Sequence, residues 1–168
     1  SLNNASYEGS RYQGAMSASD RAKLWISFVV VALSACTTTT SSIAQESKPG
    51  LVATYADAHR KVSHVVALPN FSLKSAESVH PQINRRFSAE WSGLLRIGRA
   101  GEYHVFADGA EIHIQGKATA GLTKLATGEH PLRIRFKRTI DNARLELRWE
   151  SEFFRSEPVP SAVLRHVG

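Results

Sequence analysis

The chain has 168 residues, of which 42% are hydrophobic and 21% are charged, and its formal net charge is +6. This length allows one domain with a buried core besides a tail or leader, and the composition is that of a globular protein. The single cysteine excludes an intrachain disulfide, a zinc finger and a CxxC redox pair. A basic balance fits nucleic acid, an anionic membrane surface or an acidic polysaccharide, although basic domains without such partners are common.

Residues 16–36 have the features of a secretory leader. Met16 precedes two basic residues, and an apolar run follows from Leu24 to Ala35. A basic region before about 7–15 apolar residues is typical of a signal peptide, whereas a membrane-spanning helix needs about 20. A buried core helix is the alternative, which the Thr- and Ser-rich segment after the run disfavours. We therefore expect an exported protein.

The end of the apolar run predicts a lipid anchor. Leu33-Ser34-Ala35-Cys36 resembles a bacterial lipobox, in which the cysteine thiol is acylated and becomes the new N-terminus. Cleavage after Ser42-Ile43-Ala44 by an ordinary signal peptidase is the alternative. Acylation of Cys36 would make the membrane a partner and place the protein in the cell envelope, as a periplasmic or surface lipoprotein. Outside the cytoplasm, nucleic acid is not an expected partner.

The expected organisation has four segments. They are an upstream extension that is disordered or reflects a mis-set start (1–15), the leader (16–36), a polar linker (37–48) and a folded domain (49–166).

Period-two alternation of apolar and polar residues predicts strands within the folded domain. Such alternation gives one buried and one solvated face, as in antiparallel sheets. From Asp57 to Asn84 we expect loops with one or two short strands. Several short strands separated by turns predict an all-β fold, an antiparallel β-sandwich. The apolar sets are Leu51, Ala53 and Tyr55; Phe87, Ala89 and Trp91; Leu132, Ile134 and Phe136; and Leu145, Leu147 and Trp149.

The segment 103–114 predicts a hairpin. Asp108-Gly109 is a favoured two-residue type I′ turn. The implied register pairs Val105 with Ile112 and His104 with His113. Two histidines opposite each other, with Glu111 on the same face, could share a zinc ion, and a pair of exposed histidines is the plainer alternative.

The order of these motifs from Arg86 to Pro160 resembles the protective-antigen-type (PA14) domain. Gly101-Glu102-Tyr103-His104-Val105-Phe106, Ile112-His113-Ile114-Gln115-Gly116 and Leu145-Glu146-Leu147-Arg148-Trp149 carry the resemblance. It implies a β-sandwich that recurs in secreted toxins, glycosidases and adhesins. It also implies that the segment 157–164 crosses back to close the sandwich, and that Trp149 lies where the closing strand packs. Trp91 and Trp149 both lie on the apolar faces of their strands, so we expect them in the core, and an exposed tryptophan that stacks on a sugar is the alternative.

The resemblance further implies a calcium and sugar site at the 107–109 tip, where the family has two aspartates joined by a cis peptide. Here the first is Ala107, and Gln115 stands where the family has another acid. Calcium typically takes 6–8 oxygen ligands. We therefore expect a degenerate site with no calcium or other cofactor. The candidate ligand-binding residues are Asp108, Gly109, Asp141 and Asn142, although each also suits a turn.

The last strands carry basic residues on their polar faces: Arg133, Arg135, Lys137 and Arg148, with Arg138 and Arg144 nearby. Interleaved glutamates favour a salt-bridged solvent face. A patch for anionic glycans or lipid headgroups is the alternative.

Enzyme motifs such as Gly-x-Ser-x-Gly, HExxH and the phosphate-binding loop are missing from the sequence. We expect a non-catalytic, extracytoplasmic binding or interaction module with carbohydrate as its ligand class and a glycan or an envelope protein as partner. The alternative is a structural accessory or protein-interaction domain of a larger envelope-associated enzyme or haem protein.

Overall fold

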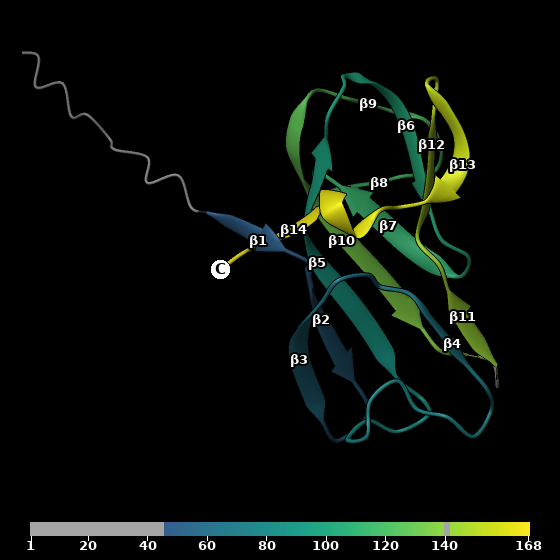
Figure 1. The fold of residues 1–168 in the computed structure, drawn as a ribbon. Coiled ribbons are helices and arrows are strands. Elements are labelled where there is room, and N and C mark those ends of the chain that lie inside the picture. Colours follow the sequence, from purple (N-terminus) through teal and green to yellow (C-terminus); the bar gives the residue numbers. More distant parts are fainter. Residues whose placement is uncertain (1–45, 140–141) are drawn as a thin grey trace, which may run out of the picture. The chain divides into compact units, whose positions relative to one another are not determined.

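The computed structural model describes residues 46–139 and 142–168, which form a two-layered antiparallel β-sandwich (Figure 1). The expected leader with Cys36, the linker up to residue 45, and Asp141 lie outside the described residues. Among the residues that are described, no helix is long and apolar enough to cross a membrane.

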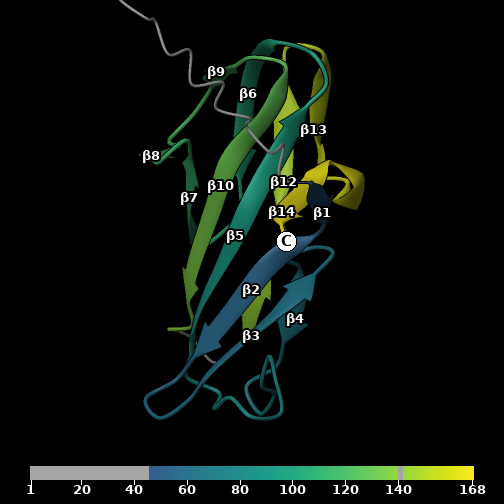
Figure 2. The ribbon, with the colours of Figure 1, turned by 90° about the vertical axis from the view of Figure 1, so that its left-hand side faces the viewer.

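The larger sheet is built on β5 (Ser88–Ile97) and β10 (Gly128–Lys137), which pair along their whole length. Two strands share the other edge of β5 (Figure 2): β2 (Leu51–Ala56) pairs with its first half, and β14 (Leu164–Val167) pairs with its second half. The remaining strands of this sheet are β1 (Ser47–Pro49), β3 (Lys61–Val66), β7 (Ala110–Ile114) and β8 (Lys117–Ala118).

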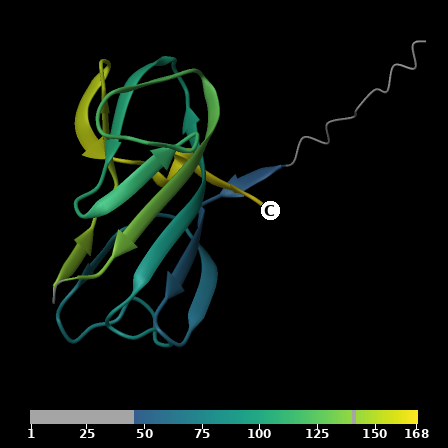
Figure 3. The same ribbon diagram turned by 180° about the vertical axis from the view of Figure 1, so that it is seen from behind.

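The opposite layer holds a four-stranded sheet and a two-stranded one (Figure 3). In spatial order the four strands are β13 (Phe154–Pro158), β12 (Arg148–Ser151), β6 (Gly101–Phe106) and β9 (Thr123–Leu125). The short pair is β11 (Ala143–Leu145) and β4 (Phe71–Leu73). After β13 the chain crosses through the 3₁₀ helix η1 (Ser161–Val163) to β14 in the larger sheet, so the expected closing crossover is confirmed.

The predicted apolar faces meet in one core. Leu51, Ala53 and Tyr55 of β2 are buried, and so are alternate residues of β10. Trp91 is 0% exposed and Trp149 8%, which confirms that both belong to the core. The two short strands β3 and β4 and the loops around them match the expectation for 57–84.

The predicted hairpin over 103–114 is wrong. β6 pairs with β9 and β12 in the smaller sheet, whereas β7 pairs with β10 and β8 in the larger one. The chain therefore crosses between the layers at Asp108-Gly109. Only Gly109 has positive φ, at 71°, so the turn lacks the two positive φ angles of type I′. Apolar residues alternate equally well in a hairpin and in such a crossing, because both place them toward the core.

The two-residue hairpin turn lies one strand later. Gln115 and Gly116 have φ values of 54° and 77°, and Ile114 pairs with Lys117 across them. Two consecutive residues with positive φ are the mark of a type I′ turn. Gln115 stands where the PA14 family has an acidic residue. In this structure it belongs to the turn between β7 and β8.

Candidate functional site

The crossing between β6 and β7 borders a hollow of ≈360 Å³, here called the Asp108 hollow. It brings together three of the four candidate ligand-binding residues: Asp108 and Gly109 from the crossing, and the exposed Asn142 just before β11. The fourth, Asp141, lies outside the described residues. The other residues of the lining are Ser72, Leu73, Phe136, Lys137, Thr139, Ala143 and Arg144.

The lining of the Asp108 hollow combines apolar and polar side chains. A Cβ atom on Gly109 would lie 3.7 Å from Cε2 of Phe136, so the glycine leaves the edge of that ring next to the hollow. Ser72, Thr139 and Asn142 add two hydroxyl groups and an amide to the lining. Small-molecule sites commonly have this composition, in which a few polar groups orient the ligand over apolar surface.

The described residues of the Asp108 hollow do not fit a calcium ion. Asp108 is the only carboxylate among them, and Lys137 and Arg144 contribute positive charge. Ala107, which precedes Asp108 in the sequence, has no side-chain oxygen. A calcium ion takes six to eight oxygen ligands and favours carboxylates. Within residues 46–139 and 142–168 there is no cis peptide bond and no cluster of three metal-binding side chains.

The expected His104–His113 pair is wrong for the same reason as the hairpin. The two histidines lie on the outward sides of different sheets, because β6 and β7 do not pair. Nδ1 of His104 lies 3.1 Å from Glu150 Oε1, and Nε2 of His113 lies 2.6 Å from Glu111 Oε1. Each ring thus has a separate acidic neighbour, and no zinc site forms between them.

The basic candidates do not lie on one sheet. Arg133, Arg135 and Lys137 belong to β10. Oε1 of Glu90 lies 3.7 Å from Nε of Arg133, and its Oε2 lies 3.0 Å from Nε of Arg135. Arg148 belongs to β12 of the smaller sheet, where Nη1 lies 3.4 Å from Glu146 Oε1. Arg133, Arg135 and Arg148 thus each lie beside a glutamate, on two different sheets.

Arg138 and Arg144 depart from a shared basic face in different ways. Arg144 is exposed, and its Nη2 lies 2.9 Å from Glu146 Oε2. Arg138 is only 6% exposed, and it donates to the carbonyl oxygens of Glu77 at 2.6 Å and Lys74 at 2.8 Å. Its guanidinium therefore holds the loop between β4 and β5 in place.

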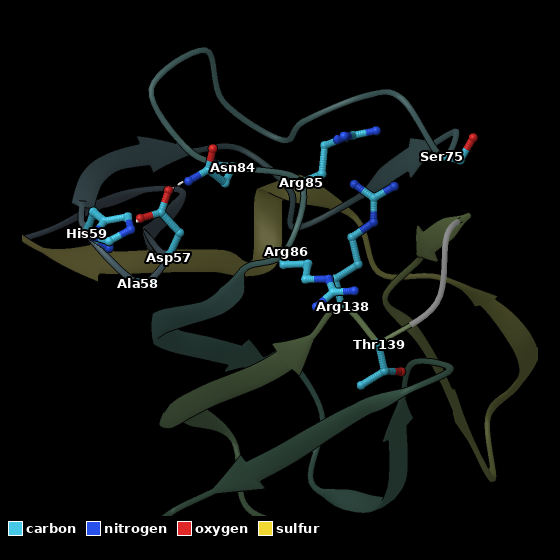
Figure 4. Close-up of a pocket in the computed structure, with 9 residues that line it drawn as sticks. All are labelled: Asp57, Ala58, His59, Ser75, Asn84, Arg85, Arg86, Arg138 and Thr139. Atoms are coloured by element: carbon cyan, nitrogen blue, oxygen red, sulfur yellow. Dashed lines mark hydrogen bonds between the residues drawn. The ribbon is translucent and has the colours of Figure 1, made fainter.

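A second hollow of ≈540 Å³, which the sequence did not suggest, lies where the loops at 57–60 and 84–86 meet the end of β10 (Figure 4). We call it the Arg85 hollow. Asp57 ties the two loops together: its Oδ1 accepts from the backbone N–H groups of His59 and Arg60, and its Oδ2 from that of Asn84, each at 2.8 Å. These bonds lower the pKa of Asp57 below its ordinary value of 3.8, the Asn84 bond most of all.

No family model matches the sequence, and no curated protein matches it. Solved structures do match its fold. An anti-sigma factor domain-containing protein from Clostridium clariflavum has a TM-score of 0.62 at 20% identity, covering 70% of this chain and 47% of that one. The PA14 domain of the antifreeze protein MpAFP has a TM-score of 0.57 at 14% identity, covering 72% and 92%.

The chain has the fold of a PA14-like β-sandwich. The epithelial adhesin 6 A domain (Epa6A) from Candida glabrata shares it, with a TM-score of 0.54 at 14% identity and coverage of 72% of this chain and 88% of that one. The chain spans about half the length of the anti-sigma factor domain-containing proteins that it matches, 47% and 48%.

Proposed function

We propose that this chain is a non-catalytic binding module that recognises carbohydrate without calcium, through the Asp108 hollow. The observation that carries the proposal is the meeting of Asp108, Gly109 and Asn142 in one hollow that apolar side chains also line. Two structures of similar fold support it: a PA14 sugar-binding domain from an RTX adhesin, and Epa6A, which was solved in complex with Galβ1-3GlcNAc.

The lining supplies what an uncharged sugar needs. Sugar hydroxyl groups both donate and accept hydrogen bonds, and so do the hydroxyls of Ser72 and Thr139 and the amide of Asn142. The carboxylate of Asp108 accepts from a further hydroxyl. The sugar's C–H face lies against Leu73 and the edge of Phe136. Most of these few hydrogen bonds are neutral and contribute about 0.5–1.5 kcal/mol each, so the expected affinity is low.

The experiment is a glycan-binding titration of the full chain and two variants. A glycan selected on an array is titrated against wild type, S72A/N142A and the control S161A, which removes a hydroxyl from η1, outside the hollow. The double variant is expected to bind roughly tenfold more weakly, since two hydrogen bonds are lost. Unchanged affinity in S72A/N142A would place the binding elsewhere.

A second candidate function is an interaction module within a larger protein. The chain matches only part of longer proteins, including 27% of the transport component of a Clostridium botulinum toxin. In this case the domain positions other domains and binds no sugar. Co-purification of a protein partner, together with no glycan binding, would favour this candidate.

Export and lipid anchoring at Cys36 complete the proposal, and they rest on the sequence alone. Growth of the natural host with a labelled fatty acid tests the anchor. We expect label in the wild-type chain and none in C36S, and label in neither would instead favour cleavage before Gln45.

A further inference from the structure

The Arg85 hollow is lined mostly by cationic and neutral polar side chains. Arg85, Arg86 and Arg138 supply guanidinium groups, and His59 supplies an imidazole (Figure 4). Among the described residues of the lining, Asp57 is the only carboxylate. Arg85 and Arg86 thus bring two guanidinium cations beside one carboxylate, and this excess of positive charge favours an anion in the hollow.

The carboxylate of Asp57 is already hydrogen-bonded to the protein backbone. Both of its oxygens accept backbone N–H groups of the loops at 57–60 and 84, and the resulting low pKa keeps it ionised at neutral pH. No ion pair joins it to an arginine of the hollow within the described part of the chain. Asp57 therefore holds the two loops together, and we call these three hydrogen bonds the Asp57 clamp.

Arg85 and Arg86 make no ion pair and donate no side-chain hydrogen bond among the residues that the structure describes. By contrast, Arg133 and Arg135 lie against Glu90. Both free side chains are exposed at the hollow, so their donors are available to a ligand.

The loop that carries these two arginines is fixed at both ends. Asn84 donates its backbone N–H to Asp57, and the carbonyl of Phe87 accepts from the backbone N–H of Arg138 at 3.0 Å. Fixing the loop in advance reduces the ordering cost of binding. The loop therefore presents two adjacent guanidinium groups from a positioned backbone.

We infer that the Arg85 hollow binds the oxyanion of an acidic saccharide, a carboxylate or a sulfate or phosphate ester. Guanidinium groups recognise such oxyanions through paired, charge-assisted hydrogen bonds. Thr139 lines both this hollow and the Asp108 hollow, so the two sites adjoin. A sugar in the Asp108 hollow places the acidic group of a neighbouring sugar at Arg85 and Arg86. This inference rests on the proposed function.

The test is a titration of the full chain with matched charged and uncharged saccharides. The probes are tetragalacturonate, its methyl ester and a chondroitin sulfate tetrasaccharide, and phosphatidylglycerol vesicles and inorganic sulfate are run beside them. The variant is R85Q/R86Q. The control is R96Q/R155Q, which removes the same charge at two exposed arginines outside the hollow.

We expect an acidic saccharide to bind wild type at least about tenfold more tightly than the methyl ester, with an affinity that falls as salt rises. In R85Q/R86Q this preference disappears while affinity for the methyl ester stays, and in R96Q/R155Q the preference persists. An equal loss in both variants, or tighter binding to the vesicles or to sulfate alone than to the saccharides, would overturn the inference.

The outcomes separate this inference from the proposed function. If wild type binds neutral sugars and shows no preference for acidic ones, only the inference about the Arg85 hollow fails. If it binds no saccharide of either kind, both fail.

Discussion

Gln115 donates its side-chain amide to the buried ring of His130. Nε2 of Gln115 lies 2.7 Å from Nδ1 of His130, and Nε2 of His130 lies 2.7 Å from the carbonyl oxygen of Ala126. Because a carbonyl only accepts, Nε2 of His130 carries the proton and Nδ1 accepts from the glutamine. The residue that stands in place of an expected acid thus satisfies a buried histidine that is 6% exposed.

Shortening this side chain should destabilise the fold. Asn tolerates the positive φ of position 115, but it is one methylene shorter and leaves Nδ1 of His130 without its donor. We expect Q115N to lower the free energy of unfolding by about 1 kcal/mol in urea denaturation. Q82N, at an exposed turn, is the control and should have no measurable effect. Equal stability of Q115N and wild type would show that the bond contributes nothing.

Gly93 lies where β2 and β14 share the edge of β5, and a Cβ atom there would meet the carbonyl oxygen of Arg165 and lie 2.6 Å from Leu51 Cδ2. Backbone atoms cannot move aside cheaply, so G93A should cost about 1–3 kcal/mol. The matched control is G98A, where a Cβ atom meets nothing within 4 Å. Thermal unfolding of both variants checks the difference, and a tolerated G93A would contradict the shared edge.

The Asp57 clamp predicts a pH-dependent loss of stability. Its pKa in the folded protein is lowered, so its contribution is present above about 3.8, the ordinary value, and is lost as the pH falls through the lower folded value. D57A should therefore melt below wild type at neutral pH, and the two melting temperatures should converge in strong acid. D108A, which removes a carboxylate outside the clamp, is the control. A difference that persists in strong acid would rule out the ionised clamp.

Trp91 predicts the largest loss of stability in the core. It is fully buried, and the centroid of its ring lies 5.9 Å from the ring centroid of Tyr55 and 6.2 Å from that of Phe71. W91A should cost about 3–5 kcal/mol in the free energy of unfolding. Phe153 is 38% exposed and packs under Arg99, so F153A should cost only about 0.5–1 kcal/mol. Similar losses in urea denaturation would mean that the core is wrongly assigned.

Local alternation predicted the buried faces but not the pairing of strands. Trp91 and Ile134 were assigned correctly because period two alone decides which side chain turns inward. Whether β6 turns back or crosses to the other sheet at Asp108 depends on contacts with β9, β10 and β12, which a local pattern does not contain.

The burial of Arg138 follows a signal that the sequence did carry. It continues the inward series of Leu132, Ile134 and Phe136, although its charge suggested a solvated position. The Arg85 hollow escaped prediction because Asp57 and Arg138 bind residues that lie far from them in the sequence, Asn84 and Glu77.

A glycan array probed with the full chain, once with calcium and once with a chelator, tests most directly whether the protein binds sugar without calcium. Binding to the same glycans with equal strength under both conditions is the result that we predict, because the described residues of the Asp108 hollow supply a single carboxylate. Binding that disappears in chelator would contradict the claim and show that Asp108 still anchors a metal ion. Binding under neither condition would favour the interaction module instead.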